Sequence, residues 1–349
     1  MKNLYGWFHS LRMVWAVLLA LVVGSGLILS TGLNPLSAYA ALFKGAFLDY
    51  HGLADTLVKM CPMLLAGLAV IVPLRCGLLN VGAEGQIYLG GLCAAAVALY
   101  LPDLPDVLHM LLCLLAGMVG GGLWAFIPAF LKATRGINEV IVTLLMNYVG
   151  INLVSYFASG PMMQPGAPYP YSPEIREGLW LPLLMPDSDT HIGVLIAIAC
   201  SVVVWAVLRF TTLGFSVSTV GRNPHAAQYA GISIKKHVIG AMIVGGAFAG
   251  LAGAIEVIGL KYRLFHLFSP GYGYDGIVVA FMAGLNPLLA PISAFFLAGL
   301  GTGAQSMQRA IGLDVTVIEA IRGLLVVFVA AGLAWRYTRS AAPTLPGGA

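Results

Sequence analysis

One stretch of this sequence places hydrogen-bonding side chains inside apolar surroundings. Residues 73–91 hold Asn80, Glu84 and Gln86 among five glycines. Polar groups at membrane depth are tolerated only against protein or a water-filled cavity. We therefore expect a helix break that lines a pathway or packs a gate near its cytoplasmic end. A structural ion pair between Glu84 and Arg75 explains the carboxylate equally well.

A second set of polar residues recurs with helical spacing. Glu139, Thr143 and Asn147 are four residues apart, which places them on one face of a helix. Such a stripe should face other helices or a pore rather than lipid. Hydrogen bonding between helices and contact with a solute both remain open as its role.

Aromatic and acidic residues come together in the segment Ser269–Gly276. Tyr272 and Tyr274 could stack on a planar or sugar-like ligand, and Asp275 could accept hydrogen bonds from hydroxyl or amine groups. The alternative is that these tyrosines anchor the chain at the membrane interface, where tyrosine is common.

The segment 220–232 is the clearest polar, helix-capable loop between two long apolar stretches. Asn223 and Pro224 fit a helix start, and Gly231 fits a helix stop. A short helix of about one and a half turns is expected between them, and it could dock onto a soluble partner. An ordinary capped loop is the alternative. The residues expected to form the docking element are Gly221, Asn223, Pro224, Ala226, Ala227, Tyr229 and Gly231.

The composition defines the class of protein that must position these groups. Of the 349 residues, 59% are hydrophobic and 9% are charged, whereas soluble domains carry about 25% charged residues. The chain is therefore expected to be an all-α, polytopic membrane protein. About ten transmembrane helices are expected, near 13–33, 60–74, 81–100, 107–130, 139–158, 191–208, 237–259, 271–285, 288–308 and 315–335.

Charge and glycine patterns refine this topology. Basic residues concentrate on one set of connections, which the positive-inside rule assigns to the cytoplasm together with both termini. The same reasoning attributes the net charge of +4 to topology rather than to nucleic-acid binding. Three Gly-x-x-x-Gly pairs indicate close helix packing: Gly117/Gly121, Gly246/Gly250 and Gly299/Gly303.

The domain organisation is expected to be simple. Residues 1–340 should form a single transmembrane domain, and residues 341–349 a disordered tail. The first apolar run is too long for a usual signal-peptide core, so an uncleaved first helix is favoured over cleavage near Ala38-Tyr39-Ala40. Interrupted segments near 73–91 and 270–287 suggest an internal repeat. The outer loop near 159–190 could be a lid or a cap that faces a receptor.

Motifs for chemistry on the chain itself are missing from the sequence. There is no Gly-Lys dipeptide and hence no usual phosphate-binding loop, no His-Glu-x-x-His and no Gly-x-Ser-x-Gly. The five cysteines lie in apolar stretches without metal-ligand spacing. No catalytic residue, metal or cofactor is therefore expected.

Four blocks of the sequence resemble a known family. They are Gly77–Gln86, Asn138–Asn147, Val220–Gly231 and Pro270–Gly276, and they occur in the same order in nucleoside-type permeases of ATP-binding-cassette (ABC) importers. These permeases belong with those for ribose-like sugars and branched-chain amino acids. The resemblance covers roughly residues 60–335.

The resemblance implies one membrane subunit of a larger importer in the bacterial inner membrane. Its implied partners are a cytoplasmic ATPase dimer, a second homologous permease and an extracytoplasmic solute-binding protein. The segment 220–232 would be the coupling helix, through which ATP-driven closure of the ATPase switches the cavity from outward to inward. Rival hypotheses are a permease for a simple sugar, a membrane scaffold or enzyme, and an ion-coupled transporter whose proton carriers would be Glu84, Glu139, Glu256 or Glu319.

Overall fold

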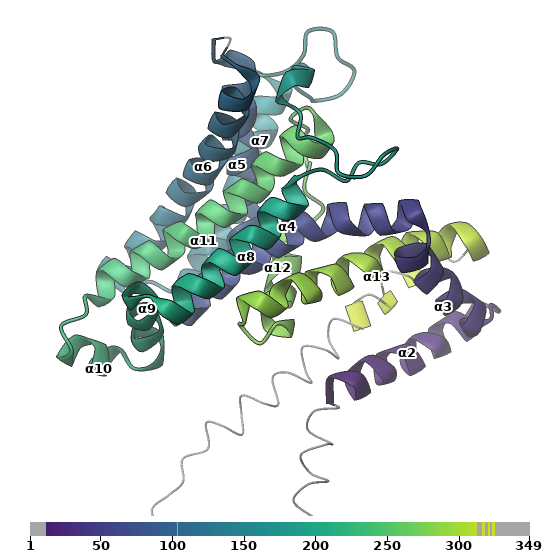
Figure 1. Cartoon of the computed structure of the whole chain (residues 1–349), viewed down its shortest axis with the longest axis horizontal. Coiled ribbons are helices and arrows are strands. Elements are labelled where there is room, and N and C mark those ends of the chain that lie inside the picture. Colours follow the sequence, from purple (N-terminus) through teal and green to yellow (C-terminus); the bar gives the residue numbers. More distant parts are fainter. Residues whose placement is uncertain (1–11, 103, 313–315, 318–319, 322, 325–349) are drawn as a thin grey trace, which may run out of the picture. The chain divides into compact units, whose positions relative to one another are not determined.

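The protein is predominantly helical in the part that its structure, a computed structural model, describes (Figure 1). The described residues are 12–324 apart from 103, 313–315, 318–319 and 322, and within them strand pairing is limited to two isolated bridges. The α-helices are α2 (Arg12–Ser30), α3 (Pro35–Phe43), α4 (Tyr50–Arg75), α5 (Ala83–Tyr100), α6 (Asp106–Arg135), α7 (Glu139–Ser159), α8 (Gly193–Phe210), α9 (Thr212–Arg222), α10 (Pro224–Tyr229), α11 (Ile234–Glu256), α12 (Tyr272–Met282) and α13 (Ala290–Ile311). Shorter turns are the π-helices η1 (Lys44–Leu48) and η3 (Val257–Lys261) and the 3₁₀-helices η2 (Glu177–Leu179) and η4 (Pro287–Leu289).

Six stretches of helix among the described residues are long and apolar enough to cross a membrane. They are α4, α6, α7, α8, α11 with η3, and α13 with η4. The all-helical, multi-pass class is therefore confirmed, whereas the count of about ten remains a prediction. The predicted segment 315–335 lies largely outside the described residues, as do Glu319 and the tail 341–349.

The segment predicted near 60–74 is longer than expected. The structure has one helix of 26 residues there, α4, which contains Pro62 and Pro73 without ending at either. Proline removes a backbone donor and usually kinks a helix, but neighbouring helices can compensate for this within a membrane protein. Burial fits that explanation, since 83% of the most apolar window of α4 is buried.

The chain divides into two compact units. One comprises residues up to Leu53 and from Gly299 onward, and the other runs from Ala54 to Ala298. In the first unit, Gly299 faces the ring of Phe47 and Gly303 faces Leu42, so this predicted glycine pair does mediate close packing. The second unit contains every candidate site residue.

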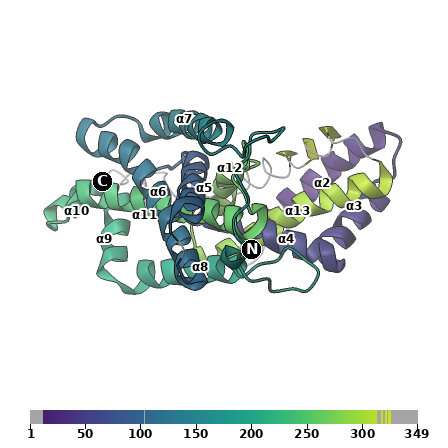
Figure 2. The same cartoon turned by 90° about the horizontal axis from the view of Figure 1, so that it is seen from above.

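Helix α11 is the central element of the second unit and packs against both α5 and α6 (Figures 1 and 2). Glycines bring these backbones together. A Cβ on Gly250 would meet the carbonyl of Gly117, one on Gly121 would meet that of Gly246, and one on Gly90 would meet that of Gly250 itself. The close packing predicted from the two other Gly-x-x-x-Gly pairs is confirmed.

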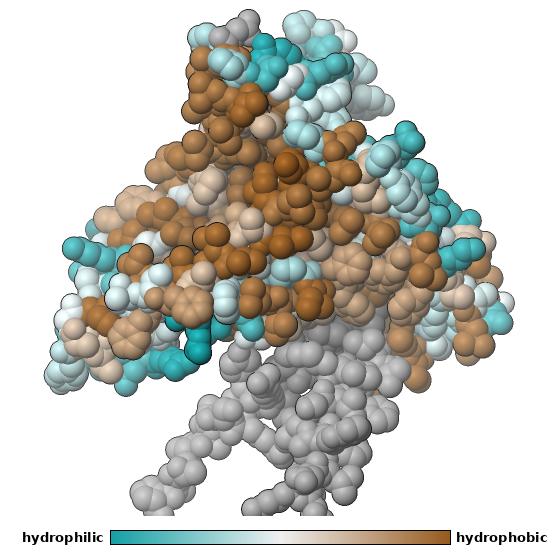
Figure 3. Space-filling view, viewed as in Figure 1, coloured by the Kyte–Doolittle hydropathy of each residue, from teal (hydrophilic) through white to brown (hydrophobic). Residues whose placement is uncertain are grey.

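The remaining long helices of this unit present apolar side chains outward. Only 33%, 22% and 28% of the most apolar windows of α6, α7 and α8 are buried, against 67% for α11. Figure 3 shows the result as a broad apolar face, with hydrophilic residues gathered toward its ends. Such a surface suits contact with lipid or with another membrane helix.

Candidate functional site

The helix break predicted within residues 73–91 lies between α4 and α5. Helix α4 ends at Arg75, and Gly77 takes a left-handed conformation with φ of 83°. The Gly77 N–H donates to the carbonyl of Leu74 and the Leu78 N–H to that of Pro73, at 3.1 and 3.0 Å. This is the hydrogen-bond pattern of a Schellman cap. The chain then stays non-helical until Ala83.

Two buried amides hold the break together. Asn80 Nδ2 donates to Gln86 Oε1 at 2.9 Å, and Gln86 Nε2 donates back to Asn80 Oδ1 at 3.1 Å. Asn80 also donates to the carbonyl of Ala69 and accepts from the N–H of Gly82. Both side chains are almost fully buried, so these polar groups satisfy one another inside the protein.

Glu84 connects the break to the start of α12. Its buried carboxylate accepts the backbone N–H of Gly273 through Oε2 at 2.7 Å. The alternative pairing with Arg75 is wrong. Arg75 instead donates from Nε and Nη2 to the carbonyl of Leu285, at 3.0 and 2.7 Å.

The polar stripe on α7 faces protein, as its spacing predicted. Asn147 is fully buried, accepts the N–H of Gly85 at 2.8 Å, and donates to the carbonyl of Val81 at 2.9 Å. Thr143 is also buried and bonds to carbonyls of its own helix. Glu139 forms an ion pair with Lys132 at 2.8 Å, which joins the end of α6 to the start of α7.

The residues of the third candidate group differ in their exposure. Tyr272 is buried at the start of α12, whereas 39% of Tyr274 is exposed. The Tyr274 hydroxyl accepts from Asn147 Nδ2 at 3.3 Å, so the first turn of α12 meets the stripe on α7. Asp275 is half-buried in the same turn. Tyr274 and Asp275 are therefore the more accessible members of a buried polar cluster formed by α5, α7 and α12.

The predicted short helix of the 220–232 segment is α10. Asn223 caps it by accepting the N–H of Ala226 at 3.1 Å, and Pro224 occupies the first turn. Gly231 ends it with φ of 76°, and Ile232 donates back to the carbonyl of Ala227. Ala227 alone is buried in this helix, while 94% of Tyr229 is exposed. The segment thus forms an ordered helix that is exposed on the surface (Figure 1).

The sequence did not predict helix α9 or the packing of Gly221 against another helix. Residues 212–222 form a helix before α10, and its first turn is capped by Thr211. Gly221 lies directly against the backbone of Arg75 and Cys76 at the end of α4. The glycine was visible in the sequence, but no local pattern indicates that it meets residues about 145 positions earlier.

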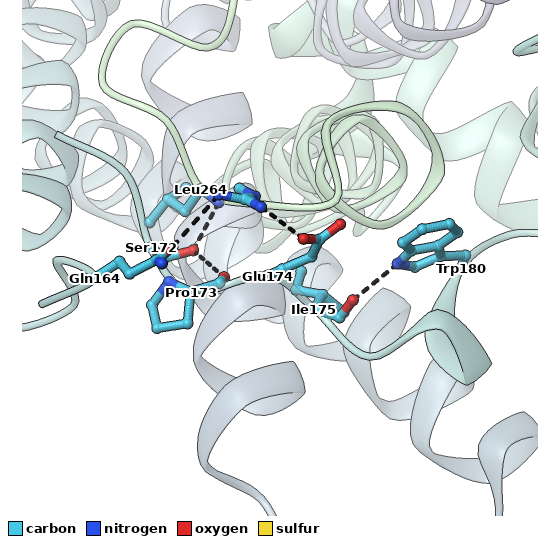
Figure 4. Close-up of polar contacts among 8 residues, drawn as sticks. Gln164, Ser172, Pro173, Glu174, Ile175, Trp180 and Leu264 are labelled. Atoms are coloured by element: carbon cyan, nitrogen blue, oxygen red, sulfur yellow. Dashed lines mark hydrogen bonds and ion pairs between the residues drawn. The ribbon is translucent and has the colours of Figure 1, made fainter. Parts of the chain in front are cut away.

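The loop near 159–190 is ordered by pairing with residues 258–266. The Ser172 N–H donates to the carbonyl of Leu264, and the Leu264 N–H donates to the Ser172 hydroxyl, both at 3.0 Å (Figure 4). Glu174 forms an ion pair with Arg263 at 2.6 Å. Trp180 stacks on Tyr262 with ring centroids 4.0 Å apart. This loop is therefore held against the segment that follows α11 (Figure 4).

A buried imidazole lies between this loop and α8. Burial lowers the pKa of His191 to about 4, and its Nδ1 accepts the N–H of Gly193 at 3.2 Å. The imidazole is therefore held neutral at ordinary pH.

The carboxylates proposed as proton carriers have different surroundings. Glu84 accepts a backbone N–H and Glu139 is ion-paired, as described above. Glu256 is buried, and its Oε1 has no hydrogen-bond partner among the described residues, although Lys261 Nζ lies 3.9 Å away. Within the described residues no cluster of histidine, cysteine, aspartate or glutamate could hold a metal ion.

These features define a polytopic helical membrane protein, and the sequence comparison gives its family. The chain belongs to the family described as "Branched-chain amino acid transport system / permease component", which matches residues 52–330. Its relatives are permease subunits of ABC transporters, so the chain is a transport component and not an enzyme.

Three curated relatives cover nearly the whole chain. It is 34% identical to the guanosine ABC transporter permease protein NupP of Bacillus subtilis, over 94% of this chain and 95% of that protein. It is 36% identical to the glucose ABC transporter permease protein TsgB13 of Haloferax volcanii, over 90% and 86%. It is 31% identical to the nucleoside ABC transporter permease protein NupB of Lactococcus lactis, over 90% and 89%. No solved structure matches the chain.

Proposed function

We propose that this chain forms half of the translocation pathway of an ABC importer for a nucleoside or a related small polar solute. The observation that carries the proposal is its similarity, over almost its full length, to permeases named for guanosine and nucleoside transport. The second candidate is a simple sugar, because the glucose permease is equally similar. The tyrosines of α12 suit either solute, since aromatic rings can stack on a base or on a sugar face.

The proposal assigns separate roles to the polar residues. Asn80, Glu84, Gln86, Thr143 and Asn147 hold the broken helices in place, and Glu139 fixes the α6–α7 connection. Tyr274 and Asp275, which are more accessible, contact the solute, with Tyr272 supporting them from beneath. Buried polar groups that are already satisfied gain little from a ligand, whereas Tyr274 and Asp275 are partly exposed and therefore within reach of a solute.

The exposed helix α10 is the coupling helix of this proposal. It would rest on a cytoplasmic ATPase dimer, with Gly221 at its base and both chain termini on the same side of the inner membrane. A second homologous permease completes the pathway, and an extracytoplasmic binding protein delivers the solute. About ten transmembrane helices in a single domain over residues 1–340 complete the proposed topology.

Uptake in the native host tests both the function and the solute. Cells lacking the chain should lose energy-dependent uptake of radiolabelled guanosine, and the intact chain should restore it. If cells lacking the chain instead lose uptake of radiolabelled glucose while guanosine uptake is unchanged, the sugar is the solute. Uptake that persists in ATP-depleted cells with an intact proton gradient would contradict an ABC importer and favour ion coupling.

Substitutions in α10 test the coupling role. Replacing Asn223 with Ala, Pro224 with Gly or Gly231 with Val should abolish uptake while the chain still inserts in the membrane. Affinity purification in mild detergent should then recover less ATPase with these variants than with the unaltered chain. Normal uptake in all three variants would contradict the coupling assignment.

A further inference from the structure

The end of α4 is in direct contact with the end of α9. A Cβ on Gly221 would clash with the carbonyl of Arg75 and lie 2.9 Å from the carbonyl carbon of Cys76. A Cβ on Gly77 would lie 3.3 Å from the Cα of Gly221. The two backbones therefore touch with no side chain between them, and neither can move toward the other.

The side chain of Arg75 extends this contact to a third element. Its Nε and Nη2 both donate to the carbonyl of Leu285, just beyond α12. That carbonyl is held in place, because Leu285 has φ of 59° and its N–H donates to the carbonyl of Ala280 in a Schellman-type cap. A guanidinium remains charged at all physiological pH values and has a rigid planar shape. Arg75 thus connects the end of α4 to the end of α12.

Helix α12 is also fixed at its start and along its length. Glu84 accepts the N–H of Gly273 at the first turn, as described above. In the middle of the helix, Gly276 packs on Ala66 of α4, and Val279 packs on Gly67. The short helix that holds Tyr274 and Asp275 is therefore attached to α5 at its start, and to α4 along its length and at its end.

This series of contacts begins at α10. Asn223 is at once the C-cap of α9 and the N-cap of α10, so a single residue separates the two helices. Displacement of α10 must therefore displace the end of α9, where Gly221 rests on Arg75.

We propose that Gly221 and Arg75 form the joint through which motion of the coupling segment reaches α12 and its solute-facing turn. Arg75 is a positioning residue in this scheme and does not touch the solute. The inference rests on the proposed function, because it requires an ATPase that moves α10.

The test uses the complete transporter in native membranes, with two matched pairs of variants. Arg75→Gln removes the forked contact, and Arg209→Gln is its control, since Arg209 is an exposed arginine at the end of α8. Gly221→Ala forces α9 away from α4, and Gly240→Ala is its control, because a Cβ on Gly240 meets nothing within 4 Å. Uptake, ATP hydrolysis and recovery of the ATPase are measured for each variant.

The joint predicts that Arg75→Gln still binds the ATPase and still hydrolyses ATP, while uptake falls about tenfold to a hundredfold, the range for losing a hydrogen bond to a charged group. Gly221→Ala should also lower uptake, because the added Cβ would meet the carbonyl of Arg75. Arg75→Lys, which keeps the charge but not the fork, should recover uptake only in part. Both controls should behave like the unaltered chain.

Three results have distinct meanings. Unchanged uptake in Arg75→Gln overturns the joint. Loss of the ATPase together with the folded chain in Arg75→Gln and Arg75→Lys assigns Arg75 a structural role and also overturns it. An unaltered chain that binds no ATPase and transports without ATP refutes the proposed function itself, whatever the variants do.

Discussion

The break at residues 76–82 and the segment at 223–231 are both short pieces of chain between longer helices, yet they are stabilised in opposite ways. In the break, Asn80 is fully buried and makes hydrogen bonds to three other residues. In the other segment, Asn223 is exposed and its side chain makes one hydrogen bond, to the helix that it caps. The same residue type therefore serves tertiary structure in one place and only local structure in the other.

The difference indicates which region satisfies its polar groups within the protein and which region leaves its surface exposed. Polar groups inside the membrane-embedded core must be satisfied by the protein itself, and the break meets that requirement. Helix α10 has six residues and one buried side chain, which is too little packing to explain an ordered helix by tertiary contacts alone. Caps at both ends keep it folded, and its exposed face is available for a partner.

The largest effect on stability is expected for Asn80→Ala. It leaves the amide of Gln86, the carbonyl of Ala69 and the N–H of Gly82 without this partner, which should lower the free energy of unfolding by about 3 kcal/mol or more. Thermal unfolding of the detergent-solubilised chain measures it. The matched variant Asn223→Ala loses only a helix cap and should cost about 1 kcal/mol or less. Equal losses in the two variants would remove the distinction between these regions.

A smaller loss is expected for Asn147→Ala. This side chain joins α7 to α5 and α12 through Gly85, Val81 and Tyr274, and leaving the backbone groups unpaired should cost about 2 kcal/mol. Asn152→Ala on the same helix is the control, because Asn152 is exposed and bonds only to Tyr148 of its own helix. The melting temperature of the first variant should fall clearly below that of the second. A shift in the control as large as that in Asn147→Ala would contradict the structural role.

Sequence patterns predicted the features that depend on neighbouring residues. The cap residues Asn223 and Gly231 marked both ends of α10, and the four-residue spacing of Thr143 and Asn147 marked a buried helix face. Hydropathy failed at the start of α4, where Asp55 and Lys59 interrupt the apolar run although the helix already begins at Tyr50. Half-buried charged residues inside a helix cannot be told from a polar connection by hydropathy alone.

The tertiary contacts of the site could not be predicted from such patterns. Arg75 and Leu285 are 210 positions apart, and pairing of Arg75 with the nearby Glu84 was one of the two alternatives that the sequence left open. Opposite charges close in sequence favour that expectation, but a backbone carbonyl at a helix end is an equally good acceptor for a guanidinium. Only the fold determines which acceptor is near.

The buried His191 provides a pH test that is independent of the segment at 223–231. Because burial lowers the pKa of His191 from 6.5 to about 4, the unfolded chain binds a proton there that the folded chain does not bind between these values. Stability should therefore fall as the pH drops through this window, by at most about 3 kcal/mol. Melting temperatures across the window measure the loss. His191→Gln should flatten this dependence, whereas His225→Gln in the exposed helix α10 should leave it unchanged.

The smallest effect on stability, and the sharpest separation of the two regions, is expected for Tyr229→Ala. Because 94% of this side chain is exposed, its removal should change the free energy of unfolding by less than about 0.5 kcal/mol. An exposed aromatic residue on an ordered helix is, however, well suited to be an anchor in a partner's groove. Recovery of the ATPase and solute uptake should therefore fall in Tyr229→Ala while the melting temperature stays the same. If Tyr100→Ala, which removes another exposed tyrosine at the far end of α5, lowered both to the same extent, α10 would have no special place in coupling.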